Sequence, residues 1–380
     1  MKSEVISAFL SERIKAGDFP SAVYLVAEKG EVRFSDALGF AVKISDRKIP
    51  AQVETIYDLA SLTKVLVTGL LCAGLVERGE IKLNDPVGHY LPGFQTAEKR
   101  HLTIRDLLTH VSGFSAWKPF YLLANRLKGT DKIENPKAEA LGAIALEDLQ
   151  NEPRTTVRYS DFNFLTLGFL IERIYKADLA EIARQEISLP LKLEQTAFNP
   201  AFPREQIAAC EFGNEYEMQT CLEMGYEISN PHEIFRNRLI WGEVHDGNCY
   251  FLGGASGHAG LFSTAREVFK IALQFLPRTS HLLKPETCNL FKTNFTKNLN
   301  EARSFAFELA ATENSTAGFA LAQDSFGHLG FTGTSLWIEP ARERIFILLT
   351  NRTHQQLPFV NINSTRRQFH DLASGQLGDF

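Results

Sequence analysis

The chain has few of the residues that mark specialised classes of protein. Its 380 residues include five cysteines, 26 glycines and 15 prolines. The cysteines are scattered and odd in number, which fits neither a disulfide framework nor paired metal ligands, so we interpret them as free thiols in a reducing compartment. Glycine and proline are too few for collagen or low-complexity sequence, and an apolar fraction of 44% excludes a wholly disordered chain.

A strong excess of basic charge is also missing. The formal net charge is -5, and lysine and arginine are dispersed, with Arg366 and Arg367 as the densest basic pair. Such a chain has no electrostatic footprint for a nucleic acid or an anionic membrane surface. We therefore expect no nucleic-acid partner and a small-molecule or peptide substrate, whereas the oligomeric state cannot be read from the sequence.

Long hydrophobic runs are absent as well. The most apolar stretch, residues 65–76, is well short of the roughly 20 residues that a membrane-spanning helix requires. The first thirty residues contain acidic and basic side chains at intervals that leave no apolar segment of a signal peptide. These features predict no transmembrane segment and a cytoplasmic location, or a periplasmic or extracellular one if a leader has been removed.

The pattern of β-rich and helical segments predicts an α+β protein. Residues 21–40 form two β-rich runs around a Glu-Lys-Gly turn, which predicts a hairpin. Further β-like runs occupy residues 318–321, 333–338 and 344–349, and helical signals occupy residues 59–78, 103–108, 146–151, 162–175 and 265–275. The β runs from both chain ends are expected to share one antiparallel sheet. Residues 200–248 lack clear periodicity, and we interpret them as an irregular excursion that covers a site.

Three Ser-x-x-Lys pairs are candidates for nucleophilic chemistry. Residues three apart are neighbours on a helix, so a serine hydroxyl and a lysine amine at this spacing can meet, and the amine can assist removal of the hydroxyl proton. The motif alone is weak, because about one or two copies arise by chance at ordinary composition. The copies are Ser45 with Lys48, Ser61 with Lys64, and Ser115 with Lys118.

Context favours the pair Ser61 and Lys64. Ser45 lies in a charged turn, and Pro119 after Lys118 disfavours helical backbone at that lysine. Ser61 opens a segment that is apolar nearly all round, which is typical of a buried helix, so Lys64 is expected to be buried at its start. The alternative interpretation makes Ser61 a helix N-cap and Lys64 a surface lysine.

Two further segments carry polar groups that could join this pair. Tyr159-Ser160-Asp161 precedes an apolar helix, at a loop end from which side chains can project into a cleft. The alternative is an N-cap at Ser160 or Asp161 with Tyr159 packed in the core. The segment His328-Leu-Gly330-Phe331-Thr-Gly leads into a β run, and its glycines allow a strand edge to approach a substrate closely.

Together the three elements resemble those of the penicillin-recognising serine hydrolases, which include class C β-lactamases, D,D-carboxypeptidases, D-aminopeptidases and related esterases. The order and spacing match along the whole chain, and the runs 83–92, 102–114 and 253–264 are also similar to family sequences. The resemblance implies a β-lactamase/transpeptidase-like fold, with an antiparallel sheet flanked by helices from residues 1–80 and 265–380. It also implies a mostly helical inserted domain from residues 81–264, with the site between the two parts.

The same resemblance implies roles for individual residues. Ser61 corresponds to the acylated nucleophile, Lys64 to its partner in proton transfer and Tyr159 to the general base, although the residues alone leave Lys64 and Tyr159 both open as base. The implied oxyanion hole consists of the backbone N–H groups of Ser61 and Phe331. Asp161, His328 and Gly330 correspond to substrate-binding positions, and neither a cofactor nor a metal is implied.

Two positions depart from the usual family pattern. Asp161 stands where asparagine is more usual, so a carboxylate is expected near Lys64, which favours a charged lysine and Tyr159 as base. His328 stands where β-lactamases have a lysine, so a permanent cation for a substrate carboxylate is missing there. The sequence therefore predicts hydrolysis of an ester or a small D-amino-acid amide or peptide rather than efficient β-lactam hydrolysis.

Other chemistries and functions are less well supported. The chain has no P-loop, no G-x-S-x-G elbow and no H-E-x-x-H metal motif, and His258 in a glycine-rich turn is interpreted as structural. An acyltransferase that uses the same acyl-enzyme remains an alternative, as does a non-catalytic protein that binds peptides or muropeptides. The second is disfavoured because the serine, lysine and tyrosine are all present.

Overall fold

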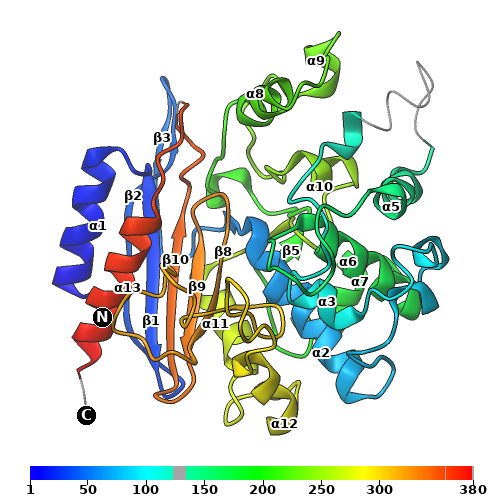
Figure 1. Cartoon of the computed structure of the whole chain (residues 1–380). Coiled ribbons are helices and arrows are strands. Elements are labelled where there is room, and N and C mark those ends of the chain that lie inside the picture. Colours follow the sequence, from blue (N-terminus) through cyan, green and yellow to red (C-terminus); the bar gives the residue numbers. More distant parts are fainter. Residues whose placement is uncertain (123–133, 356, 379–380) are drawn as a thin grey trace.

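An antiparallel sheet dominates the computed structural model, which describes residues 1–122, 134–355 and 357–378. Within these residues the sheet has seven strands in the order β3-β2-β1-β10-β9-β8-β7 (Figure 1). Its strands are β1 (Ser21–Glu28), β2 (Glu31–Lys43), β3 (Lys48–Pro50), β7 (Glu308–Leu309), β8 (Phe326–Leu329), β9 (Ser335–Glu339) and β10 (Arg344–Thr350). Leu25 of β1 pairs with Ile347 of β10, so the two chain ends lie side by side. The predicted antiparallel sheet from both ends of the chain is confirmed.

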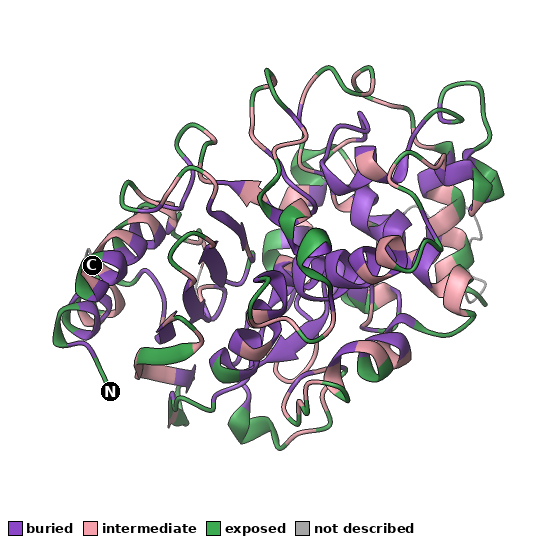
Figure 2. Cartoon of the chain, turned by 90° about the horizontal axis from the view of Figure 1, so that it is seen from below, coloured by how far each residue is buried: buried purple, intermediate pink, exposed green. Residues whose placement is uncertain are grey.

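Helices cover both faces of this sheet. Alternate side chains of β1 enter two cores, because successive residues of a strand point to opposite faces. Tyr24 belongs to the core beneath α1 (Glu4–Ala16) and α13 (Asn363–Leu377), which lie together on one face in Figure 1. Leu25 belongs to the larger core on the other face, where α11 (Ala265–Ala272) contacts β1 and β10. Figure 2 shows these buried strands and helices in purple, with most exposed residues on the loops.

The middle of the chain is mostly helical. Its α-helices are α2 (Leu70–Glu77), α3 (Ile104–Leu108), α5 (Pro136–Leu146), α6 (Asp161–Tyr175), α7 (Leu179–Ala183), α8 (Glu215–Glu223), α9 (Pro231–Ile234), α10 (Gly247–Phe251) and, later in the chain, α12 (Pro285–Cys288). A small antiparallel sheet of β4 (Tyr57–Asp58), β6 (Leu261–Ser263) and β5 (Ala197–Phe198) lies among them. The predicted domain boundaries at residues 80/81 and 264/265 stay a prediction.

The predicted helix over residues 59–78 is confirmed, with an irregular start. A 3₁₀ turn, Ala60–Leu62, leads into a π-helical turn, Lys64–Gly69, and then into α2. The run Ala60–Glu77 is long and apolar enough to cross a membrane by length and composition alone, but 78% of it is buried inside the fold. It is therefore the core helix that the apolar pattern predicted.

Two predicted elements are wrong. Residues 318–321 form no strand, because the backbone N–H groups of Phe319 and Ala320 both donate to Asp371 Oδ1 instead of to a neighbouring strand. Residues 146–151 form no helix beyond Leu146, the last residue of α5. The N–H of Leu149 donates to Glu98 Oε1 and that of Gln150 to the carbonyl of Gly113, so tertiary partners replace helical ones.

Candidate active site

Ser61 lies at a strained turn that presents its hydroxyl to a cavity. It is the second residue of the 3₁₀ turn, where early N–H groups have no partner within the helix. The preceding residue, Ala60, has φ of 46°, in the left-handed region that costs an L-residue roughly 1–2 kcal/mol. Its N–H donates to Asp58 Oδ1 at 2.8 Å, which holds the strained turn in place.

Lys64 is fully buried and touches the Ser61 hydroxyl. Its Nζ lies 2.9 Å from Ser61 Oγ, 3.1 Å from the His258 carbonyl and 2.7 Å from Asp161 Oδ1. Burial alone would lower the pKa of Lys64, but the Asp161 carboxylate and Tyr159 outweigh it and raise that pKa above its ordinary value. The expected carboxylate beside Lys64 is thus confirmed, and the lysine is an ammonium that donates to Ser61 Oγ.

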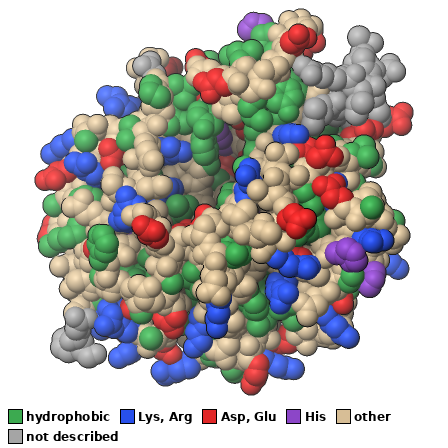
Figure 3. Space-filling model, in the orientation of Figure 1, with side chains coloured by type: hydrophobic (Ala, Val, Ile, Leu, Met, Phe, Trp, Pro, Cys, Tyr) green, Lys and Arg blue, Asp and Glu red, His purple; other side chains and the backbone are tan. Residues whose placement is uncertain are grey.

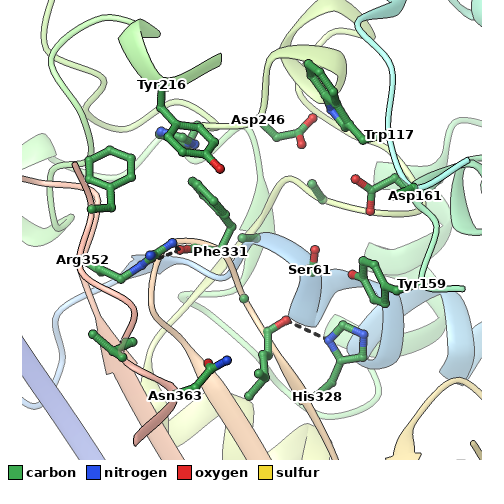
Figure 4. Close-up of a pocket in the computed structure, with 18 of the residues that line it drawn as sticks. Ser61, Trp117, Tyr159, Asp161, Tyr216, Asp246, His328, Phe331, Arg352 and Asn363 are labelled. Atoms are coloured by element: carbon green, nitrogen blue, oxygen red, sulfur yellow. Dashed lines mark hydrogen bonds between the residues drawn. The ribbon is translucent and has the colours of Figure 1, made fainter. Parts of the chain in front are cut away.

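Tyr159 lies beside Ser61, and its hydroxyl points toward the serine in Figure 4. Its ring packs against His110, with centroids 4.6 Å apart, and against His328, with centroids 5.7 Å apart. Burial raises the pKa of the phenol, although the nearby Lys64 ammonium opposes this change. Tyr159 is therefore a neutral phenol at rest, held in place by two histidine rings.

His110 helps to position Tyr159, a role that the sequence analysis did not predict. Its Nδ1 accepts a hydrogen bond from the Ser160 N–H at 3.1 Å, so the loop that carries Tyr159 is tied to the ring against which Tyr159 packs. Burial lowers the pKa of His110 well below its usual range, which favours a neutral ring. The Ser160 N–H donor then places the one ring proton on Nε2.

His328 is a neutral hydrogen-bonding group. Its Nδ1 lies 2.8 Å from the Leu329 carbonyl, which can only accept, so Nδ1 carries the proton (Figure 4). Burial, with Lys64 and Arg303 nearby, lowers the pKa of His328 well below its usual range. A neutral ring agrees with the expectation that position 328 supplies no cation. The buried Nε2 has no hydrogen-bond partner among the described residues and is left as an acceptor.

The turn after His328 is bound to the segment before Ser61. The Thr332 hydroxyl donates to the Asp58 carbonyl at 2.7 Å, and the Thr334 hydroxyl donates to the Leu59 carbonyl at 3.0 Å. A Cβ at Gly330 would lie 2.5 Å from the Leu59 carbonyl oxygen, so only glycine allows this approach. Within the described residues the Phe331 N–H donates no hydrogen bond. It is thus free to face a substrate beside Ser61.

These groups open onto a cavity of about 670 Å³. Figure 3 shows the molecule hollowed here, with hydrophobic side chains on the rim. The lining residues include Ser61, Trp117, Tyr159, Asp161, Tyr216, Glu217, Asp246, Arg303, His328, Gly330, Phe331, Arg352, Phe359, Asn363 and Arg366. Tyr216, Glu217 and Asp246 belong to the excursion over residues 200–248, so this segment supplies part of the cavity wall. The segment is less irregular than predicted, because it contains α8 and α9.

The cavity carries charges of opposite sign on different walls. Asp161 and Asp246 lie on one side in Figure 4, and Arg352 lies on the other beside Phe331.

The sequence analysis did not identify these arginines as site residues, although the sequence around Arg366 contains a pattern that could have identified it. Along α13 it shares its helical face with Phe369, His370 and Ala373, at spacings of three, four and seven, and all are buried. An arginine on the apolar face of a helix is expected to be buried, and a buried guanidinium needs polar partners inside the fold.

Within residues 1–122, 134–355 and 357–378, Asp161, Asp246 and His258 form a group whose ligand atoms could hold a metal ion, since these atoms lie within 4.8 Å of one another. The Lys64 ammonium already neutralises Asp161, and His258 bonds to Asp246 Oδ1 and Ser256 Oγ. The donor set is therefore satisfied by protein groups, and a second cation beside Lys64 would be repelled. The ring contacts of His258 agree with the structural interpretation of this residue.

Asp161→Asn is expected to move the rising limb of the pH–rate profile to lower pH. The Asp161 carboxylate raises the pKa of both Lys64 and Tyr159, so its removal lowers the pKa of whichever group must lose a proton before it can act as base. The measurement is kcat/KM for a neutral ester between about pH 6 and 10, with Asp161→Glu as the control that keeps the charge. A limb that stays in place or moves to higher pH would contradict this electrostatic role.

Comparisons with known proteins agree with this geometry. The family model described as Beta-lactamase matches residues 6–368. A protein of Escherichia coli strain K12 named "Putative D-alanyl-D-alanine carboxypeptidase" is 29% identical over 365 residues, covering 91% of this chain and 81% of that protein. A protein of the same name from Salmonella gallinarum strain 287/91 is 32% identical over 384 residues, covering 94% of this chain and 85% of that one.

A solved structure supports the fold alone. The octameric penicillin-binding protein homologue from Pyrococcus abyssi superimposes with a TM-score of 0.72 at 18% identity, covering 100% of this chain and 78% of that chain. This likeness confirms the α+β fold with its flanked antiparallel sheet. The resemblance that the three sequence motifs suggested is confirmed by the family model and the relatives.

Proposed function

Because the chain belongs to the β-lactamase family, we propose that it is a serine hydrolase that forms an acyl-enzyme on Ser61 and releases the carboxy-terminal residue of a short D-amino-acid peptide. The contact between the buried Lys64 ammonium and the Oγ of Ser61, which lines the cavity, is the observation that carries the proposal. The names of the relatives support the peptide as substrate.

The reaction begins when Ser61 Oγ attacks the carbonyl carbon of the scissile amide. A new C–O bond forms, the serine proton moves to the base, and the carbonyl oxygen becomes an oxyanion facing the N–H groups of Ser61 and Phe331. The C–N bond then breaks, and the amine leaves with the transferred proton. Water attacks the ester in the same site, which releases the acid and restores Ser61.

Tyr159 is the proposed base. Lys64 donates to Ser61 Oγ as an ammonium, and an ammonium cannot accept the serine proton. The serine O–H is then free to donate to Tyr159, whose phenolate is stabilised by the same ammonium. Since the pKa of the phenol lies above its ordinary value, this mechanism expects activity to rise with pH through the neutral range.

Arg352 is the proposed binding group for the substrate's terminal carboxylate. It lines the cavity, is only partly buried, and has no acidic partner among the described residues. Its guanidinium stacks 4.8 Å from the centre of the Phe331 ring and donates to the Phe331 and Val360 carbonyls. These contacts hold a cation beside the oxyanion position, where the neutral His328 supplies none.

Removal of this cation is expected to abolish a preference for free carboxylates. The two substrates are a peptide ending in D-Ala-D-Ala and its analogue with a terminal carboxamide. We expect the wild type to cleave the peptide with the free carboxylate at least about tenfold faster, because one charge-assisted hydrogen bond contributes that much. Arg352→Met should raise KM for the acid and leave the amide nearly unchanged. The control is Arg47→Met, which removes a guanidinium stacked on Trp241 outside the cavity.

Three results would count against the proposal. Equal hydrolysis rates on acid and amide in the wild type would show that no subsite recognises the carboxylate. Equal losses of rate on both substrates in Arg352→Met would show that Arg352 supports the turn at Phe331 and does not bind the substrate. Transfer of the acyl group to an added amine in preference to water, seen by product analysis, would favour the acyltransferase alternative.

A further inference from the structure

The N–H of Phe331 belongs to a peptide unit whose carbonyl is held by a buried arginine. That carbonyl is Gly330 O, and Arg366 Nη2 donates to it at 2.8 Å and to the Thr334 carbonyl at 3.0 Å. Arg366 Nη1 donates to Asn363 Oδ1 at 2.9 Å. The side chain reaches this turn from α13, on the side of the sheet opposite α11.

Arg366 lacks the partner that a buried charge usually has. It is 6% exposed, no carboxylate within the described residues pairs with it, and its Nε has no hydrogen-bond partner there. Burial lowers the pKa of Arg366 to about 9, so the side chain is still charged at neutral pH. A buried cation without a counterion is costly, and its field acts on the dipoles and charges that lie nearest to it.

The nearest such dipole is the Gly330–Phe331 peptide. A peptide unit is planar and conjugated, so its C=O and N–H respond together. A guanidinium hydrogen-bonded to the carbonyl draws electron density toward that oxygen and leaves the N–H more positive, as in other polarised hydrogen-bond chains. The amide that faces the oxyanion is thus both oriented and strengthened as a donor.

The opposite side of the same turn is fixed to the nucleophile. Thr332 and Thr334 donate to the carbonyls of Asp58 and Leu59, just before Ser61. Arg366 and these two hydroxyls therefore form hydrogen bonds on opposite sides of the turn. The distance between the N–H of Phe331 and Ser61 Oγ depends on both sets of hydrogen bonds.

We propose that Arg366 is a positioning residue of the oxyanion hole, which orients and polarises the Gly330–Phe331 peptide so that its N–H stabilises the tetrahedral intermediate. This inference rests on the proposed acyl-enzyme chemistry of Ser61. It differs from a direct role in substrate binding, because the guanidinium is almost wholly buried and its two terminal nitrogens already donate to protein oxygens.

The test compares Arg366→Met and Arg366→Lys with Arg367→Met, which removes the neighbouring guanidinium from its contact with the Asn314 carbonyl outside the cavity. Four quantities are measured on each folded variant: the rate of labelling by a neutral fluorophosphonate, kcat for a neutral ester, KM for that ester, and the affinity of a boronic acid that forms a tetrahedral adduct. Thermal unfolding identifies any variant that does not fold.

We expect Arg366→Met to lower the labelling rate and kcat by about tenfold to a hundredfold, less than the roughly 10²–10³ lost when an oxyanion donor is removed outright. KM for the ester should stay within about twofold, and boronate affinity should fall in parallel with kcat, since both depend on the oxyanion donor. Arg366→Lys keeps the positive charge but loses the several N–H donors of the guanidinium, so its labelling rate and kcat should lie between those of Arg366→Met and of the wild type. If Arg366→Met does not fold, Arg366→Lys alone provides the test. Arg367→Met should match the wild type.

Normal labelling of the Arg366 variants would overturn the inference. So would a loss confined to carboxylate-bearing substrates and expressed in KM, because that pattern belongs to a residue that binds the substrate. A fall in kcat with unchanged boronate affinity would also overturn it. If the folded wild type is not labelled at all, the proposed function fails and this inference fails with it, whereas labelled wild type with normal variants removes this inference alone.

Discussion

Replacing Ser61 by alanine is expected to abolish covalent labelling by a fluorophosphonate and by a penicillin, and to lower ester or peptide hydrolysis by about 10⁴-fold or more. The reason is that only Ser61 Oγ lies within hydrogen-bond distance of the buried Lys64 ammonium among the described serines. Intact-protein mass after incubation with each probe measures the result. The fold should survive, because the change removes one oxygen from a side chain that lines the cavity.

The matched control is Ser115→Ala, which breaks another Ser-x-x-Lys pair. Ser115 and Lys118 both contact Glu147, so Lys118 forms an ion pair with that carboxylate instead of a hydrogen bond with Ser115. Labelling of Ser115→Ala should equal that of the wild type. An adduct that persists in Ser61→Ala would assign the nucleophile to another residue, and folded wild type without an adduct would favour the binding-protein alternative.

Tyr159→Phe is expected to lower kcat by about 10²–10⁴-fold, the usual contribution of a general base. The substitution removes only the hydroxyl and leaves the ring packed between His110 and His328, so the loss should not come from unfolding. KM should change little, since the hydroxyl acts on the serine proton. The rise of activity with pH should also disappear, because the group whose raised pKa causes it is gone.

Tyr24→Phe provides the comparison for this result. Tyr24 is also a buried tyrosine, and its hydroxyl contacts Ser7 and Ser3 in the core beneath α1, away from the cavity. Its loss should cost about 1 kcal/mol of stability and leave kcat unchanged. A Tyr159→Phe enzyme that keeps both its rate and its pH dependence would transfer the role of base to Lys64.

Local sequence patterns predicted much of the fold. The hairpin of β1 and β2, the strand β10 and the helices α6 and α11 were all expected from alternation, turn residues or apolar periodicity. The failures at residues 146–151 and 318–321 share one cause. There the backbone N–H groups are taken by Glu98, Gly113 and Asp371, which are distant in sequence, and no local pattern reveals such partners.

The candidate site divides in a similar way. Ser61 and Lys64 are three residues apart, so their contact follows from local helical geometry and could be predicted. The proximity of Asp161 to Lys64 was predicted through the resemblance of whole motifs. Arg352 was not, because its position in the cavity depends on how the loop after β10 lies against Phe331.

Which reactive groups are present, the order of the three motifs and the alternation that builds the sheet can all be read from the unfolded chain, because they depend on neighbours within a few residues. The charges of those groups and their roles depend instead on long-range packing. Lys64 is an ammonium because Asp161 lies 2.7 Å away, and His328 is neutral because it is buried. Arg366 reaches the Gly330 carbonyl because α13 packs across the sheet. Protonation and polarisation depend on distance and burial in three dimensions, and those quantities exist only once the chain has folded.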